Sequence, residues 1–299
     1  MKKNKLKSCQ FLKPIILILI SIILYALPQI LAPTYQIGIL PVDNISQKEL
    51  ITINSSFKTY NKYFQSQILN ETLNSSYIKQ ENGFLLNDDF FKYKNITHIK
   101  QKYDLDFLII TTDKQIKDFN KGGFGIWGQA DTVTETVLMT TIYFGNDKKI
   151  LPSIAQHEIF HLFGYLHNPI EKNGIMQYKD NIGTQELSNY YNIQLPIRIF
   201  VKQFITNQSF GVNYFLINLI LVLALYPLFL GLNQILQILL KNKKIKINNK
   251  INHISSNLGL FILFCMNFGH LVLFASIFLS LSINYCLCFR KIENNYIDN

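Results

Sequence analysis

The stretch from His157 to His167 constrains this chain more than any other part of its sequence. It reads H-E-x-x-H-x-x-G-x-x-H, with the middle histidine at His161. Residues four apart lie on one face of a helix, so the first two imidazoles can reach the same ion. Gly164 can adopt the left-handed conformation that ends a helix and turns His167 back toward that ion. The pattern predicts a zinc site with three histidine ligands and one open position, which is typical of catalytic zinc.

Glu158 follows the first of these histidines. Its side chain is angled away from the ligand pair toward the open position, where a carboxylate can take a proton from water. We therefore expect Glu158 to be a general base. The helix is expected to run from about Ser153 to Phe163, with residues 153–156 forming a capping box. A helix with two surface histidines is the alternative, but three histidines at this spacing, from six in the chain, rarely arise by chance.

The eleven residues resemble the zinc signature of the metzincin clan of metallopeptidases, and residues 174–176 resemble its Met-turn. The short gap between the third histidine and Met176 is similar to matrixins and to archaemetzincins. Segments at 36–42, 104–113 and 124–130 resemble archaemetzincins in type and order. The resemblance covers about residues 35 to 185. It implies an α/β (α+β) metzincin-like domain, with a twisted mixed sheet and a zinc-binding helix, that acts on a peptide or protein substrate.

The resemblance also implies roles for individual residues. Met176 would pack beneath the histidines, and Tyr178 would approach the zinc and stabilise the oxyanion; a plain core methionine and a plain core tyrosine are the alternatives. The strand before the zinc helix would be an edge strand that pairs with extended substrate. Archaemetzincins carry cysteines that bind a second zinc, but this chain has Asn168 and Asn173 in that region. We therefore expect one catalytic zinc and no second, structural zinc.

Three long apolar runs lie outside this region, at residues 14–32, 214–240 and 258–284. Each is about long enough to cross a ~30 Å hydrocarbon core as a helix. We therefore predict three transmembrane helices and a multi-pass membrane protein, with a soluble domain at 34–208. The first run could also be a cleavable signal peptide, but its length and the proline at position 33 favour an uncleaved anchor.

The net charge of +10 lies on the flanks of the apolar runs. Lysines fill the tail at 1–13 and the loop at 241–257, and short basic loops stay on the cytoplasmic side. The domain at 34–208 and the tail at 285–299 are then expected to be extracytoplasmic, although the basic residues at 290–291 run against the second assignment. The basic loop could instead bind nucleic acid, but it is short and has no interleaved aromatic residues. We expect a lipid membrane, and no nucleic acid, as a partner.

Apolar periodicity between the first two runs predicts the elements of one α/β domain. The expected strands lie at 35–42, about 77–79, 106–111 and 132–144, and the expected helices at 47 to about 69, about 90–102 and about 184–206, the last broken by Pro196. The glycines between 122 and 128 could suggest phosphate binding. No phosphate-binding motif accompanies them, so we expect a turn into the next strand.

These patterns favour a membrane-anchored zinc metallopeptidase. A second class is a membrane-bound binding protein with a zinc-stabilised but inactive outer domain, and the intact Glu158 argues against it. A third class is an intramembrane protease, which also uses H-E-x-x-H. Gln156, Glu158 and His161 make the motif helix polar, which is typical of a soluble domain rather than a membrane span.

Overall fold

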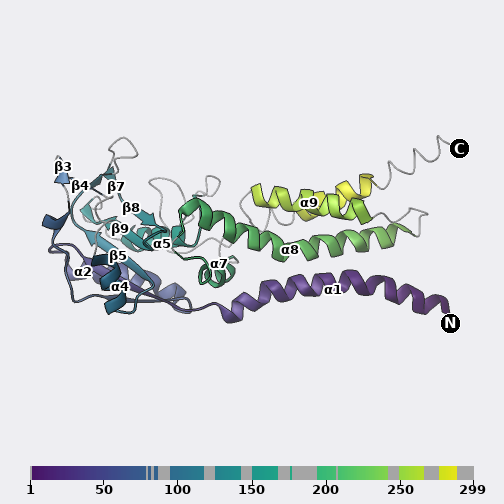
Figure 1. Cartoon of the computed structure of the whole chain (residues 1–299), viewed down its shortest axis with the longest axis horizontal. Coiled ribbons are helices and arrows are strands. Elements are labelled where there is room, and N and C mark those ends of the chain that lie inside the picture. The colour runs from purple at the N-terminus through teal and green to yellow at the C-terminus, as the bar shows by residue number, and fades with distance from the viewer. Residues whose placement is uncertain are drawn as a thin grey trace. The chain divides into compact units, whose positions relative to one another are not determined.

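The computed structural model describes residues 2–78, 80–81, 84–86, 95–117, 125–142, 150–167, 176, 194–206, 208–241, 249–265 and 276–287. The chain forms two compact units (Figure 1). We call Ala32–Ser188 with Arg198–Ile217 the sheet unit, and Met1–Leu31 with Asn189–Ile197 and Asn218–Asn299 the helical unit.

Five strands form the main sheet of the sheet unit, in the order β2-β1-β5-β9-β8. Their bounds are β1 Tyr35–Pro41, β2 Phe64–Ile68, β5 Phe107–Thr112, β8 Gly128–Asp131 and β9 Thr136–Thr140. The first four strands in this order are parallel, and β8 runs antiparallel to β9. Every residue of β5 and β9 is buried, as expected of parallel strands covered on both faces. This twisted mixed sheet agrees with the predicted α/β class.

The strands predicted at 35–42 and 106–111 are confirmed as β1 and β5. The strand predicted at 132–144 was too long, because residues 132–135 form a turn. The carboxylate of Asp131 accepts hydrogen bonds from the backbone N–H groups of Val133 and Thr134, at 3.2 and 3.1 Å, which stabilises this turn. The chain then pairs back on itself, so β9 lies inside the sheet and β8, predicted only as a turn, forms the edge. The prediction of an edge strand at 132–144 is therefore wrong.

The helix predicted from residue 47 to about residue 69 is much shorter. α2 is Gln47–Ser55, capped by a box between Ser46 and Glu49, and a 3-10 helix, η1, continues over Ser56–Tyr60. Residues Phe64–Ile68 form β2 instead, with alternating burial along the strand. This alternation has the period of a strand, and pairing with β1 satisfies the backbone of β2.

A second, smaller sheet has the strand order β3-β4-β6-β7. Its strands are β3 Gln80–Glu81, β4 Phe84–Leu86, β6 Ile116–Lys117 and β7 Gly125–Ile126. The strand predicted at 77–79 is wrong at its start, where Ser75–Tyr77 form the 3-10 helix η2. The side chain of Asn74 accepts a hydrogen bond from Ser76 N at 2.8 Å and so caps that turn. α4, Asn95–Lys102, lies within the helix predicted at 90–102.

The motif helix α5 spans Leu151–Leu162. The predicted capping box is wrong, because Ser153 lies inside the helix and Ile150 precedes it without a side-chain cap. Pro152 lies in the first turn, where the missing N–H of proline is tolerated. α7 spans Leu195–Lys202, so Pro196 lies in the first turn of this helix rather than breaking its middle, while residues 184–193 lie outside the described residues.

Aromatic side chains hold α5 against the sheet. The ring of Phe163, just after α5, lies 5.3 to 5.6 Å from the rings of Tyr35, Phe64 and Phe107 on three neighbouring strands. Phe160 packs edge-on against Tyr60 of η1 at 5.4 Å. Such pairs contribute about 0.5–1.5 kcal/mol each beyond the area that they bury. The packing fixes the position and rotation of the helix that carries the histidine motif.

The helical unit contains α1, Lys2–Leu31, most of α8, Phe210–Lys241, α9, Asn249–Cys265, and a helix over Ser276–Leu287. Among the described residues, two helical segments are long and apolar enough to cross a membrane, Phe11–Leu31 and Phe210–Leu240. They correspond to the runs predicted at 14–32 and 214–240.

The third predicted span, 258–284, is wrong as a single helix. Ser280 Oγ donates a hydrogen bond to Ser255 O at 2.8 Å, and Asn284 Nδ2 donates one to Asn252 Oδ1 at 2.9 Å. In one straight helix residues 252 and 284 would lie about 48 Å apart. α9 and the helix over Ser276–Leu287 therefore run in opposite directions. The loop predicted at 241–257 is also too long, since α9 begins at Asn249.

Candidate metal centre

The three histidines of the motif converge on one point. His157 and His161 lie one turn apart on α5, and His167 follows Gly164, whose φ of +72° confirms the predicted left-handed turn. The Nε2 atoms lie 3.0 Å apart between His157 and His161, 3.1 Å between His157 and His167, and 3.2 Å between His161 and His167. Three lone pairs that meet in this way repel one another unless a cation or protons separate them.

The donor set fits zinc. Zinc binds imidazole nitrogen at about 2.0–2.1 Å, so the ligands of a tetrahedral ion lie roughly 3.3 Å apart, close to the spacing of these three Nε2 atoms. The Nδ1 atom of His161 lies 2.7 Å from the carbonyl oxygen of Tyr165. A proton on Nδ1 donates to that carbonyl and leaves the Nε2 lone pair free to bind a metal. The backbone after α5 thus selects the tautomer that a metal ligand needs.

Glu158 is buried on α5, with 7% of its surface exposed, and lies against the start of β8. A Cβ atom added to Gly128 would lie 2.7 Å from both Oε1 and Cγ of Glu158. Only a glycine at the first residue of the edge strand leaves space for this carboxylate. Sequence reasoning assigned Gly128 to a turn, although a glycine within a strand often marks such a close approach.

Two side chains from later helices cap the end of α5. Arg198 Nη1 donates hydrogen bonds to the carbonyl oxygens of Phe163, at 3.2 Å, and Gly164, at 2.9 Å. Asn213 Nδ2 donates to Leu162 O at 2.8 Å. Both side chains are buried, and they satisfy carbonyl groups that a helix end leaves without partners.

The turn between His161 and His167 is therefore held from outside by α7 and by the first turn of α8. The guanidinium of Arg198 also lies over the ring of Tyr165, at 4.4 Å. Sequence reasoning missed both capping residues. One signal was present, because Arg198 is one of two arginines among 29 basic residues and stands in an apolar segment.

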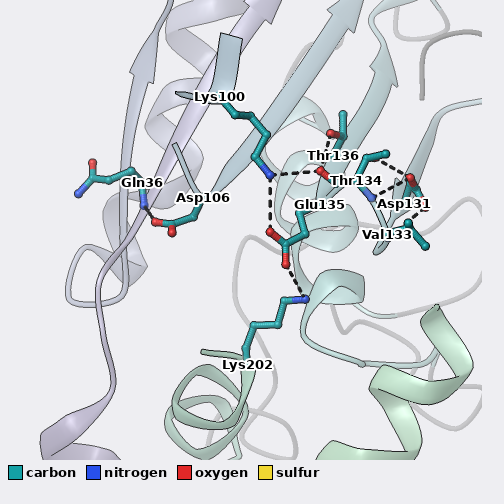
Figure 2. Close-up of polar contacts among 9 residues, drawn as sticks. All are labelled: Gln36, Lys100, Asp106, Asp131, Val133, Thr134, Glu135, Thr136 and Lys202. Carbon is teal, nitrogen blue, oxygen red and sulfur yellow. Dashed lines mark hydrogen bonds and ion pairs between the residues drawn. The ribbon is translucent and has the colours of Figure 1, made fainter. Parts of the chain in front are cut away.

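A charge cluster, partly buried, fixes the same helix α7 to the sheet (Figure 2). Glu135, in the turn before β9, pairs with Lys202 at 3.2 Å and with Lys100 at 3.5 Å. Burial lowers the pKa of both lysine ammonium groups, and the charge of Glu135 opposes this shift. Lys202 follows Arg198 by four residues, so one face of α7 carries both contacts.

A cavity of about 250 Å³ lies beside this cluster. Its lining includes Tyr35, Asp106, Glu135 and Lys202. One oxygen of Asp106 accepts a hydrogen bond from Gln36 N at 2.7 Å, and burial raises the pKa of this carboxyl group. Burial also raises the pKa of the Tyr35 hydroxyl, with the negative charges of Asp106 and Glu135 adding to the effect. None of these residues comes from the histidine motif.

The structure brings together His157, His161 and His167, with Glu158 next to the first of them on the same helix. Met176 is fully buried, while its place beneath the histidines stays a prediction. Tyr178, Asn168 and Asn173 and the other residues of the predicted Met-turn lie outside the described residues.

No protein-family model matches this chain, and no curated protein matches its sequence. Among solved structures, it is similar to an archaemetzincin from Methanopyrus kandleri, with 13% sequence identity and a TM-score of 0.46 over 56% of this chain and 96% of the other. It is also similar to an archaemetzincin from Archaeoglobus fulgidus, with 15% identity and a TM-score of 0.39 over 49% and 88%. It is similar as well to a zinc-dependent peptidase from Methanocorpusculum labreanum, with 12% sequence identity and a TM-score of 0.41 over 54% of this chain and 98% of the other.

Proposed function

We propose that the sheet unit is a zinc-dependent metallopeptidase domain that hydrolyses peptide bonds. The observation that carries this proposal is the convergence of the His157, His161 and His167 Nε2 atoms within 3.2 Å of one another. These three residues would hold one zinc ion. Bound zinc polarises a scissile carbonyl and makes water more acidic.

Glu158 is the general base of the proposed reaction. Its carboxylate takes a proton from the attacking water and passes it to the leaving amine. Gly128 leaves room for this carboxylate against the edge of the sheet, and the capped turn after α5 keeps His167 in place. Tyr178 is the proposed donor to the oxyanion, by its resemblance to the tyrosine that follows the Met-turn in some metzincins.

The edge strand β8 is the proposed binding site for extended substrate. It pairs with β9 on one side and ends the order of the main sheet on the other. A peptide that adds to β8 passes the residue against which Glu158 lies. Main-chain hydrogen bonds then hold the peptide whatever its side chains are.

The proposal includes a membrane anchor. Segments Phe11–Leu31 and Phe210–Leu240, of 21 and 31 residues, are the candidate spans. Lysines precede the first span and follow the second. By the preference of basic segments for the cytoplasmic side, the sheet unit between the two spans is extracytoplasmic.

The test compares the full-length chain with its Glu158→Gln variant in detergent and in membranes. We expect both to bind about one zinc per chain, while the variant cleaves a mixed peptide library about 10²- to 10⁴-fold more slowly. Glu71→Gln is the matched control, because it makes the same change at a partly exposed residue. It should keep full turnover.

Two outcomes would overturn the peptidase proposal. If both proteins bind zinc and neither cleaves in detergent or in membranes, an inactive, zinc-stabilised membrane binding protein is the better conclusion. If neither protein binds zinc, the three histidines do not form a zinc site.

A further inference from the structure

α9 and the helix Ser276–Leu287 lie side by side in the helical unit and run in opposite directions (Figure 1). The two helices approach closely at Gly259, where an added Cβ would lie 2.8 Å from the Cβ atom of Ser280. Asn284 contacts Asn252, whereas Ser280, four residues earlier in its helix, contacts Ser255, which lies further along α9. The chain thus leaves this pair at the end where it entered.

Uncharged polar side chains tie both helices to α8. Asn233 Nδ2 donates hydrogen bonds to Ser256 Oγ at 3.1 Å and to Ser280 Oγ at 2.8 Å. Asn284 Nδ2 donates to Asn233 Oδ1 at 2.8 Å, and Gln237 Nε2 donates to Asn284 Oδ1 at 3.2 Å. All of these side chains are buried. In hydrocarbon such groups need partners within the protein, and this network supplies them.

The opposite face of the pair is exposed and mainly apolar, although His253 and Asn257 of α9 are exposed as well. Ile254, Leu258 and Phe261 follow one another at helical spacing on α9, and Phe261 is 65% exposed. Phe278 on the neighbouring helix is 74% exposed. Large exposed apolar side chains around a polar, hydrogen-bonded interior are typical of helices in contact with lipid rather than water.

Polar and basic residues mark the end at which the chain enters and leaves this pair. The first turns of α9 carry Asn249, Lys250, Asn252 and His253. Basic residues flank both ends of the pair: Lys241, Lys243, Lys244, Lys246 and Lys250 at its start, and Arg290 and Lys291 after it.

We propose that α9 and Ser276–Leu287 form a hairpin that enters the bilayer from the side of the basic loop and returns to that side. Its exposed apolar face contacts lipid acyl chains, and its basic flanks contact the anionic headgroups of the same leaflet. The candidate single crossings are then α1 and α8, and the hairpin leaves the two ends of its own segment on one side. Arg290 and Lys291 lie on the side of the basic loop, in agreement with the preference of basic segments for the cytoplasm. The inference does not depend on peptidase activity.

The test uses the full chain in sealed membrane vesicles, with its four cysteines replaced by serine. Single cysteines are introduced by Asn248→Cys in the basic loop, Asn295→Cys after the hairpin and Lys58→Cys on η1. A membrane-impermeant maleimide added outside the vesicles should label positions 248 and 295 to the same extent. Position 58 should be labelled when those two are protected, and protected when they are labelled. If position 295 instead behaves like position 58, the chain crosses three times and the hairpin is wrong. If all three positions behave alike, α1 and α8 do not span the membrane and the topology is also wrong.

A second measurement tests the lipid contact. A nitroxide at Phe261→Cys should collide often with dissolved oxygen and rarely with a water-soluble nickel chelate, as expected within acyl chains. The matched control is the neighbouring, buried position Leu260→Cys, which should be shielded from both. If position 261 is shielded from both as well, a second copy or another protein covers this face. If the chelate reaches it, the face lies in water, and either result overturns the proposal.

Discussion

The two units bury polar groups by different means. The sheet unit buries ionisable groups: His157 and Glu158 on the motif helix, and Arg198 and Lys202 on α7. Among the described residues of the helical unit, by contrast, every buried polar side chain is a serine, asparagine or glutamine. A charge inside hydrocarbon is expensive, whereas amides and hydroxyls can satisfy one another. The sheet unit therefore keeps charged side chains in its interior, whereas the described part of the helical unit keeps only uncharged polar side chains there.

The largest effect is expected from removing the charge that caps α5. Arg198→Met leaves two buried carbonyl groups without a donor, so we expect the sheet unit to lose about 3–5 kcal/mol of stability and to bind zinc more weakly. Urea unfolding of the full chain in micelles and zinc titration would measure both effects. Arg198→Lys, which keeps the charge but fewer donors, should lie between the two proteins. An Arg198→Met variant with unchanged zinc affinity would show that the cap does not position His167.

The next prediction concerns the position of the Glu158 carboxylate and not the folding of the sheet unit. Gly128→Ala places a methyl group where the Glu158 carboxylate lies, so we expect turnover to fall about 10²-fold while zinc content stays the same. Peptide cleavage and metal analysis would check this. Gly211→Ala is the matched control, because no heavy atom lies within 4 Å of an added Cβ there. Equal turnover in the two variants would contradict the role given to Gly128.

A smaller effect is expected in the helical unit. Asn284→Leu removes hydrogen bonds to Asn233, Asn252 and Gln237, and each such bond is worth about 0.6 kcal/mol on average between membrane helices. The helical unit should be destabilised by about 2 kcal/mol, with zinc affinity unchanged. Thermal unfolding in lipid and zinc titration provide the two readings. Loss of zinc binding in this variant would show that zinc binding by the sheet unit depends on the packing of the helical unit.

The smallest effect is a pH dependence of the sheet unit. Burial lowers the pKa of Lys100 and Lys202, so in the alkaline range below their usual value these groups hold fewer protons in the folded protein than in the unfolded chain. Unfolding then takes up protons, and stability should rise with pH. The window ends near pH 10, about the usual pKa of tyrosine. Above it the raised pKa of Tyr35 reverses the slope, because the unfolded chain ionises first.

Urea unfolding at pH 8 and pH 9.5 would test this slope. Lys202→Met should reduce it, because one of the two titrating groups is gone. A slope that falls with pH, or one that Lys202→Met leaves unchanged, would show that these lysines do not set the pH dependence.

Local patterns alone determined the centre of the candidate site. The spacing of His157 and His161 follows the turn of a helix, and Gly164 turns the chain three residues after His161. The strands β1 and β5 were equally visible, because continuous apolar runs of this length suit buried parallel strands. Each of these features depends on neighbours in the chain.

Only the tertiary structure decided the partners of these elements. Arg198 and Asn213 reach α5 from 34 to 51 residues away, and Gly128 meets Glu158 across 30 residues. The apolar run at 258–284 has the hydropathy of a span, yet contacts between residues 25 to 32 apart show that it folds back on itself. Hydropathy and periodicity measure what a segment prefers to contact. Which distant segment provides that contact depends on the packing of the whole chain.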